Sequence, residues 1–144
     1  MKIAIGSDHA GFEYKEMLRA YITEKYACEV IDCGTYSTDS CDYPVFAKAV
    51  CARVAEKNAT FGILVCGTGI GMSIAANKQK GIRAAVASDE YSTKFTRLHN
   101  DANVLCMGAR VIAEEKARIL TDIFLTTEFE GGKHLRRVSM FEED

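Results

Sequence analysis

The most constraining feature of this sequence is a regular alternation between short apolar runs and longer segments of helical period. Such alternation is typical of parallel strands joined by right-handed crossover helices. The residues Ile63–Val65 are apolar without interruption, which predicts a strand buried on both faces. The expected strands are Lys2–Ser7, Glu29–Asp32, Phe61–Cys66, Arg83–Ala87 and Asn103–Met107. We therefore predict an α/β fold, a three-layer α/β/α Rossmann-like open sheet of about five parallel strands with helices on both faces.

The segments between the strands repeat apolar residues at helical spacing. The predicted buried faces are Tyr14, Leu18, Tyr21 and Ile22; Ala47, Val50, Cys51 and Val54; and Ala113, Ala117, Leu120 and Phe124. Pro44 suits the first turn of the second helix, because its missing N–H costs little there. Ser88 is the expected N-cap of a further helix that ends near His99. Since no linker or repeat interrupts the pattern, residues 1–144 are predicted to form a single domain.

The composition excludes several classes of protein. The chain has 144 residues, of which 48% are hydrophobic, and a formal net charge of -2. No global positive field exists to hold a nucleic acid, whereas a small anion needs a local cluster alone. No apolar stretch reaches the ~18 residues of a membrane span, and Asp8 and His9 interrupt the first apolar run too early for a signal peptide. We expect a cytoplasmic protein that binds neither nucleic acid nor membrane.

The cysteines and histidines lack the spacing of a metal site. No two of the six cysteines form a Cys-x-x-Cys pair, and no histidine stands at metal-ligand spacing from another histidine or cysteine. Without an export signal, the cysteines are expected to be reduced thiols, most of them small core residues. We therefore expect no bound metal.

Polar and glycine residues follow each predicted strand. These segments are Ser7-Asp8-His9, Gly34-Thr35-Tyr36, Cys66-Gly67-Thr68-Gly69, Ser88-Asp89 and Gly108-Ala109-Arg110. In an open parallel sheet, ligands bind beyond the carboxyl ends of the strands. The sequence therefore predicts a binding site at this edge.

The most informative of these segments is Cys66-Gly67-Thr68-Gly69-Ile70-Gly71, which joins a buried strand to a helix. Its glycines let backbone N–H groups turn toward a phosphate or a developing oxyanion. Three familiar loops do not fit. Met72 replaces both the third glycine of a dinucleotide loop and the arginine of a cysteine phosphatase loop, and no lysine is present for a P-loop. The segment is therefore interpreted as an anion-binding loop with a thiol at its mouth.

Three further features remain open on the residues alone. Cys66 is either a thiol acidified by the helix N-terminus or a buried cysteine that ends a strand. The segment 131–137, in which a pair of glycines is followed by a basic cluster, is either a solvated terminus or an anion clamp. His99 could merely interact with the end of its helix.

Together the motifs resemble the B-type ribose-5-phosphate isomerases, within the family that includes galactose-6-phosphate isomerase subunits. The resemblance covers essentially the whole chain. Its landmarks are Gly6-Ser7-Asp8-His9-Ala10-Gly11-Phe12, Asp42-Tyr43-Pro44, Cys66-Gly67-Thr68-Gly69-Ile70-Gly71, Ala75-Ala76-Asn77-Lys78, His99-Asn100-Asp101-Ala102-Asn103-Val104 and Gly132-Lys133-His134. This family interconverts an aldose phosphate and a ketose phosphate without a cofactor, usually ribose 5-phosphate and ribulose 5-phosphate.

The resemblance also implies the catalytic roles. Cys66 would move the proton between the two carbons, Thr68 would assist beside it, and His99 would help to open the sugar ring. The loop backbone would bind the enediolate through Gly67, Gly69, Ile70 and Gly71. A near-neutral base beside oxyanion donors is what this proton transfer needs.

Further residues match substrate-binding positions of the family. Asp8 and Asn100 correspond to sugar contacts, and Tyr43 and His134 line the site. The phosphate would be bound by Arg110, Lys133 and Arg137, with His9 nearby. Many family members have arginine in place of Lys133, and lysine keeps the charge without the bidentate fork.

The family's sites form between subunits, so the resemblance implies a homodimer, or a tetramer, with shared active sites. His99-Asn100 favours a pentose phosphate as the substrate. Two alternatives stay open: isomerisation of a hexose 6-phosphate such as allose 6-phosphate or galactose 6-phosphate, and a non-catalytic sugar-phosphate sensor. A nucleotide-binding regulator is disfavoured by the missing third glycine.

Overall fold

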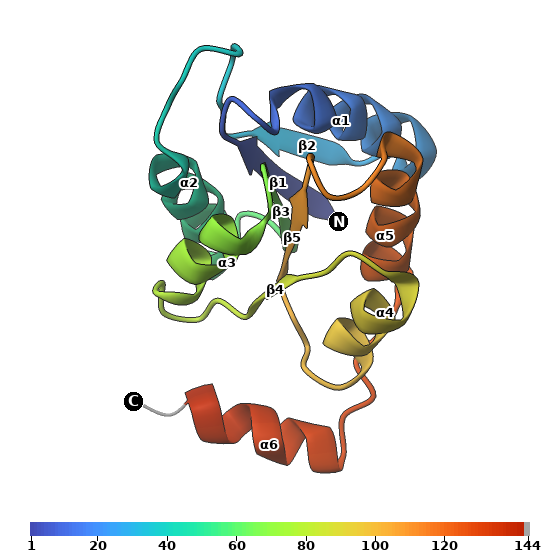
Figure 1. Cartoon of the computed structure of the whole chain (residues 1–144). Coiled ribbons are helices and arrows are strands. Elements are labelled where there is room, and N and C mark those ends of the chain that lie inside the picture. Colours follow the sequence, from blue (N-terminus) through green and yellow to red (C-terminus); the bar gives the residue numbers. More distant parts are fainter. Residues whose placement is uncertain (143–144) are drawn as a thin grey trace.

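The computed structural model describes residues 1–142 and has the predicted α/β architecture (Figure 1). Within these residues, five parallel strands form one sheet in the order β2-β1-β3-β5-β4. The strands are β1 (Lys2–Ser7), β2 (Glu29–Asp32), β3 (Phe61–Cys66), β4 (Ala84–Val86) and β5 (Val104–Gly108). The first three match their predicted bounds. β4 is two residues shorter than expected, and β5 starts and ends one residue later.

Helices cover both faces of the sheet. α2 (Tyr43–Ala55) and α3 (Ile70–Asn77) pack on one face, and α1 (Phe12–Tyr26) and α5 (Glu114–Thr126) pack on the other. α4 (Glu90–Leu98) lies beside α5. None of the helices within residues 1–142 is long and apolar enough to cross a membrane.

β3 explains why the central strands are apolar without alternation. Its residues Ile63 and Val65 join the core beneath α1 and α5, whereas Leu64 and Cys66 join the core beneath α2 and α3. All four are buried. The side chains on each face of the strand therefore stabilise the fold by removing apolar area from water, which contributes about 25 cal/mol per Å². This double burial fixes the strand end from which the glycine loop departs.

The predicted N-cap of α4 is wrong by one residue. Asp89, not Ser88, is the cap: its backbone is extended and its Oδ1 accepts a hydrogen bond from Ser92 N at 2.7 Å. This hydrogen bond holds the pKa of the Asp89 carboxyl below its usual value. A cap must stand three residues before the N–H that it accepts, and that spacing selects Asp89.

The basic C-terminal segment is a helix rather than a fully solvated terminus. α6 (Lys133–Glu142) lies outside the three layers (Figure 1). His134 and Val138 on its inner side are buried, and Arg83 Nη1 contacts Glu142 Oε1 at 3.0 Å. The turn before it uses two residues with positive φ, Gly131 at +72° and Gly132 at +58°. Glycine adopts this conformation without the steric cost of a Cβ, so the glycine pair marks a tight turn.

Candidate active site

The loops that follow β1, β3 and β5 meet at the carboxyl edge of the sheet, as predicted. Asp8 N donates to Val65 O at 3.3 Å, and Ala109 N donates to Cys66 O at 2.8 Å. Arg110 N donates to Gly67 O at 3.0 Å. These three strands are neighbours in the sheet, and backbone hydrogen bonds between the segments that follow them fix the positions of the loops.

Cys66 ends β3 with its side chain against the glycine loop. The residue is 5% exposed, and its Sγ accepts a hydrogen bond from Gly69 N at 3.1 Å. Gly69 is the N-cap of α3 and has φ +81°. A Cβ on this residue would lie 2.9 Å from the carbonyl carbon of Met107. Glycine is therefore required here both by the backbone conformation and by the close approach of β5.

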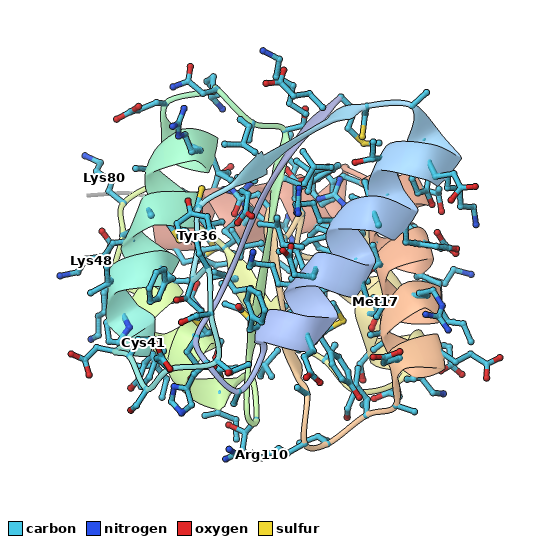
Figure 2. All side chains as sticks on the ribbon, turned by 90° about the horizontal axis from the view of Figure 1, so that it is seen from above. Met17, Tyr36, Cys41, Lys48, Lys80 and Arg110 are labelled. Carbon is cyan, nitrogen blue, oxygen red and sulfur yellow. The ribbon has the colours of Figure 1, made fainter. Side chains whose placement is uncertain are left out.

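Two predicted binding residues lie directly on the glycine loop. A Cβ on Gly67 would meet Arg110 Nη1 at 3.3 Å, so the guanidinium covers that residue. A Cβ on Gly71 would meet Tyr43 Cζ at 2.8 Å, so the phenol ring packs against the first turn of α3. The Arg110 side chain extends outward from the loop after β5 (Figure 2). The structure thus brings a cation and an aromatic ring to the loop that holds Cys66.

Thr68 and Ile70 open onto a hollow between this loop and α4. Thr68 Oγ1 accepts a hydrogen bond from Ile70 N at 3.2 Å. The hollow has a volume of about 320 Å³, and its far side is lined by Ser88, Asp89 and Ser92. Its size suits a small polar molecule, and polar groups from both sides reach it.

Asp8 and His9 follow β1 at the same edge. Asp8 is 7% exposed, and its Oδ1 accepts hydrogen bonds from Ala10 N at 3.0 Å and Gly11 N at 3.1 Å. His9 Nδ1 accepts a hydrogen bond from Cys41 N at 3.3 Å, and Cys41 Sγ lies 3.9 Å from the same atom. Cys41 lies in the segment before α2 (Figure 2). Sequence reasoning missed this contact, because the segment has no periodic pattern from which a neighbour of His9 could be inferred.

The remaining predicted site residues form a second cluster. Asp89 and Ser92, at the start of α4, line the hollow beside Thr68, whereas His99 caps the other end of this helix of nine residues, which is about 13 Å long. There the His99 ring stacks on His134, with centroids 3.9 Å apart and an interplanar angle of 11°. The other members, Asn100, Lys133 and Arg137, are exposed near the same helix ends. One chain therefore carries two separate groups of predicted site residues.

The second cluster contains the group of described residues that comes closest to a metal site. His99, Glu130 and His134 offer ligand atoms within 4.8 Å of one another. A metal ion, however, binds in the plane of an imidazole ring, and two stacked parallel rings do not share a plane. This geometry does not suit one ion held by both histidines.

The other cysteines fall into two groups by burial. All six cysteines are free thiols; Cys51 and Cys106 are buried, whereas Cys28, Cys33 and Cys41 are half-buried. Burial raises the pKa of Cys51 to about 12 and raises the pKa of Cys106 well above its usual value. Burial also raises the pKa of Cys28 and Cys33. The expectation that most of these cysteines are core residues is therefore met by Cys51 and Cys106 alone.

Comparison with known proteins identifies the family. A family profile described as Ribose/Galactose Isomerase matches residues 3–141. The chain belongs to this isomerase family. It is 49% identical over 137 residues to ribose-5-phosphate isomerase B of Escherichia coli, covering 95% of this chain and 91% of that protein. It is 43% identical to a ribose-5-P isomerase B of Listeria innocua, over 99% of this chain and 96% of that protein.

Solved structures of the family agree with the fold. A ribose 5-phosphate isomerase from Thermotoga maritima superimposes with a TM-score of 0.96 at 49% identity, covering 99% of this chain and 98% of that one. A ribose-5-phosphate isomerase B from Clostridium thermocellum has a TM-score of 0.95 at 46% identity, covering 99% and 95%. The predicted resemblance is confirmed, and the fold of the family extends over the whole described chain.

Proposed function

We propose that this protein interconverts D-ribose 5-phosphate and D-ribulose 5-phosphate in the cytoplasm, through an enediolate and without a cofactor. The observation that carries the proposal is the arrangement of Cys66 at the mouth of the glycine loop. Its sulfur receives the Gly69 N–H, and Arg110 covers Gly67 beside it. A base, an oxyanion site and a cation for phosphate therefore lie together. The choice of ribose 5-phosphate as the sugar rests on the names of the relatives.

Cys66 is the base in this proposal. Its thiolate takes the proton from C2 of the open aldose, the electron pair of that C–H bond forms the C1=C2 bond, and the π pair of the C1 carbonyl moves onto O1 to give the enediolate. The proton returns from the thiol to C1, O2 loses its proton and becomes the carbonyl, O1 gains a proton, and the ketose results. A positioned base contributes roughly 10²–10⁴-fold to such a rate. The Thr68 hydroxyl lies beside the reacting oxygens and assists their protonation.

The loop backbone stabilises the negative charge. Ile70, Gly71 and Met72 form the first turn of α3, where N–H groups have no carbonyl partner within the helix. The Ile70 N–H is directed to Thr68 Oγ1, so the Gly71 N–H is the donor proposed for the oxyanion. One oxyanion donor supplies roughly 2.7–4 kcal/mol, which is two to three factors of ten in rate.

In this proposal, the second cluster of one copy of the chain completes the site at the glycine loop of another copy. The protein would therefore work as a homodimer, or as a tetramer made of two such dimers. Two observations support this. His99 and Asn100 follow the C-terminal end of α4, whereas the Thr68 hollow is lined by Asp89 and Ser92 at the opposite end of this helix. α6, which carries Lys133, His134 and Arg137, also exposes apolar side chains to solvent in the single chain. These exposed side chains are Leu135, Met140 and Phe141.

In the completed site, Arg110 and His9 of one copy and Lys133 and Arg137 of the other bind the phosphate. Asp8, Asn100 and Tyr43 contact the sugar, with His134 beside His99. His99 opens the furanose ring, because an imidazole can both accept and donate a proton. Binding the remote phosphate helps to place the reacting carbons against Cys66.

The test is turnover of three sugars in buffer that contains a chelator. We expect kcat/KM for ribose 5-phosphate to exceed the values for allose 6-phosphate and galactose 6-phosphate by at least about tenfold, since phosphate and C1 are one carbon closer in the pentose. A higher value for either hexose would replace the pentose as substrate. Tight binding of ribose 5-phosphate without any isomerisation would instead support a sugar-phosphate sensor.

A further inference from the structure

Glu130 contacts both histidines of the second cluster and has no part in the proposed chemistry so far. Its Oε2 lies 3.6 Å from His99 Nε2 and 4.0 Å from His134 Nε2. Both distances exceed that of a hydrogen bond, but they bring a carboxylate into direct ionic contact with whichever ring is protonated. No other carboxylate of the described residues is found within ion-pair distance of either ring.

The backbone fixes the carboxylate in this place. Glu130 N donates to Leu98 O at 3.1 Å, which ties the segment to the last turn of α4. The left-handed glycine turn follows at once, and His134 N donates to Gly131 O at 3.1 Å. After α5 the chain thus passes the end of α4, turns at the glycine pair and places the start of α6 against His99. Glu130 occupies the point where these two helix ends meet.

The surroundings of His134 act on its pKa in opposite directions. Burial lowers the pKa of His134, and the neighbouring His99, Lys133 and Arg137 lower it further. Glu130 acts in the opposite direction, because its negative charge favours the protonated ring. On α4, the group that packs against His99 is the uncharged ring of Phe95, at 4.6 Å and 70°. Of the charged groups that act on His134, Glu130 alone therefore favours the protonated ring.

Building on the ring-opening role proposed for His99, we propose that Glu130 is a positioning residue for that step. With His134 stacked on one face of the ring, Glu130 orients the His99 imidazole and stabilises its protonated form.

The proton balance of ring opening shows what this would do. The C1–O4 bond breaks with its electron pair on O4, which takes a proton. The O1 hydroxyl loses a proton, and C1 and O1 form the aldehyde, so the net change is one proton moved from O1 to O4. His99 first receives the proton of the O1 hydroxyl and then donates a proton to O4. A carboxylate beside the ring favours the imidazolium that exists between the two transfers.

The test measures ring opening apart from isomerisation. In a Cys66→Ala background, exchange between the α and β anomers of ribose 5-phosphate passes through the open aldehyde and is followed by exchange NMR in buffer with a chelator. We expect Glu130→Gln to slow enzyme-catalysed exchange by roughly five- to tenfold at pH 7. The acidic-to-neutral limb of the pH profile should move to lower pH by about half a unit to one unit, since loss of the anion weakens the imidazolium. Glu128→Gln, an exposed carboxylate two residues earlier, is the matched control and should change neither.

The outcomes separate this inference from the proposed function. If His99→Ala abolishes exchange while Glu130→Gln leaves its rate and pH profile unchanged, the inference on Glu130 is wrong and the role of His99 stands. If His99→Ala leaves exchange intact, the proposed ring-opening role itself fails. Slower exchange together with a lower melting temperature but an unshifted pH profile would reduce Glu130 to a structural contact, which also overturns the inference.

Discussion

The two groups of site residues are built by different means. The glycine loop extends directly from a buried strand, and hydrogen bonds from neighbouring loops hold it on both sides. The histidine cluster lies beyond the ends of α4 and α5, where a glycine turn, one ring stack and a few ionic contacts hold it. The half of the site proposed to transfer the proton is thus part of the core, whereas the half proposed to open the ring depends on long-range contacts at the surface.

The largest effect expected from this contrast concerns the cysteines. Cys66→Ala should lower kcat by roughly 10²–10⁴-fold and leave the fold intact, since it removes the base without crowding the core. Cys51 is a matched control, because it lies in the same buried cluster with a pKa of about 12 and so stays protonated. Cys51→Ala should change kcat less than about twofold. Circular dichroism checks the fold, and substantial turnover by Cys66→Ala would contradict the role of this thiol.

The next effect compares two glycines with the same backbone angle. Gly69 and Gly81 both have φ +81°, but a Cβ meets Met107 at 2.9 Å in the first case and nothing within 4 Å in the second. Gly81→Ala should cost about 1–2 kcal/mol in the free energy of unfolding, from the backbone alone. Gly69→Ala should cost about 1–3 kcal/mol more and displace the oxyanion donors. Urea unfolding measures the difference, and equal costs would show that the loop is not held against β5.

The smallest effect concerns the cap of α4. Asp89→Ala should lower the melting temperature at pH 7 by about 2–4 °C, whereas Ser88→Ala should leave it nearly unchanged. The pKa of Asp89 is depressed in the folded state, so its contribution is present above the usual carboxyl pKa and disappears as the pH falls below it. The difference between wild type and Asp89→Ala should therefore shrink below about pH 4. A difference that is constant from pH 7 to pH 3 would argue against the charged cap.

The sequence predicted the core-built region far better than the peripheral one. The continuous apolar run of β3 located Cys66 and its loop, because burial on both faces leaves a clear local pattern. α6 was missed, since just two of its residues are buried and the preceding glycines indicate a break. The stacking of His99 on His134 was also beyond prediction, because it depends on a turn whose direction no periodicity records. The family resemblance identified His99 and His134 as site residues but did not predict where they lie in the structure.

The most direct test of the account mixes two inactive variants. If the Cys66 half and the His99 half of each site come from different chains, refolding Cys66→Ala together with His99→Ala restores one intact site in about half of the dimers. Activity with ribose 5-phosphate should then recover to about a quarter of the wild-type value. A mixture of Cys66→Ala with Thr68→Ala, which damages the same half twice, should stay inactive. If the first mixture merely equals the average of its two components, the shared site is contradicted.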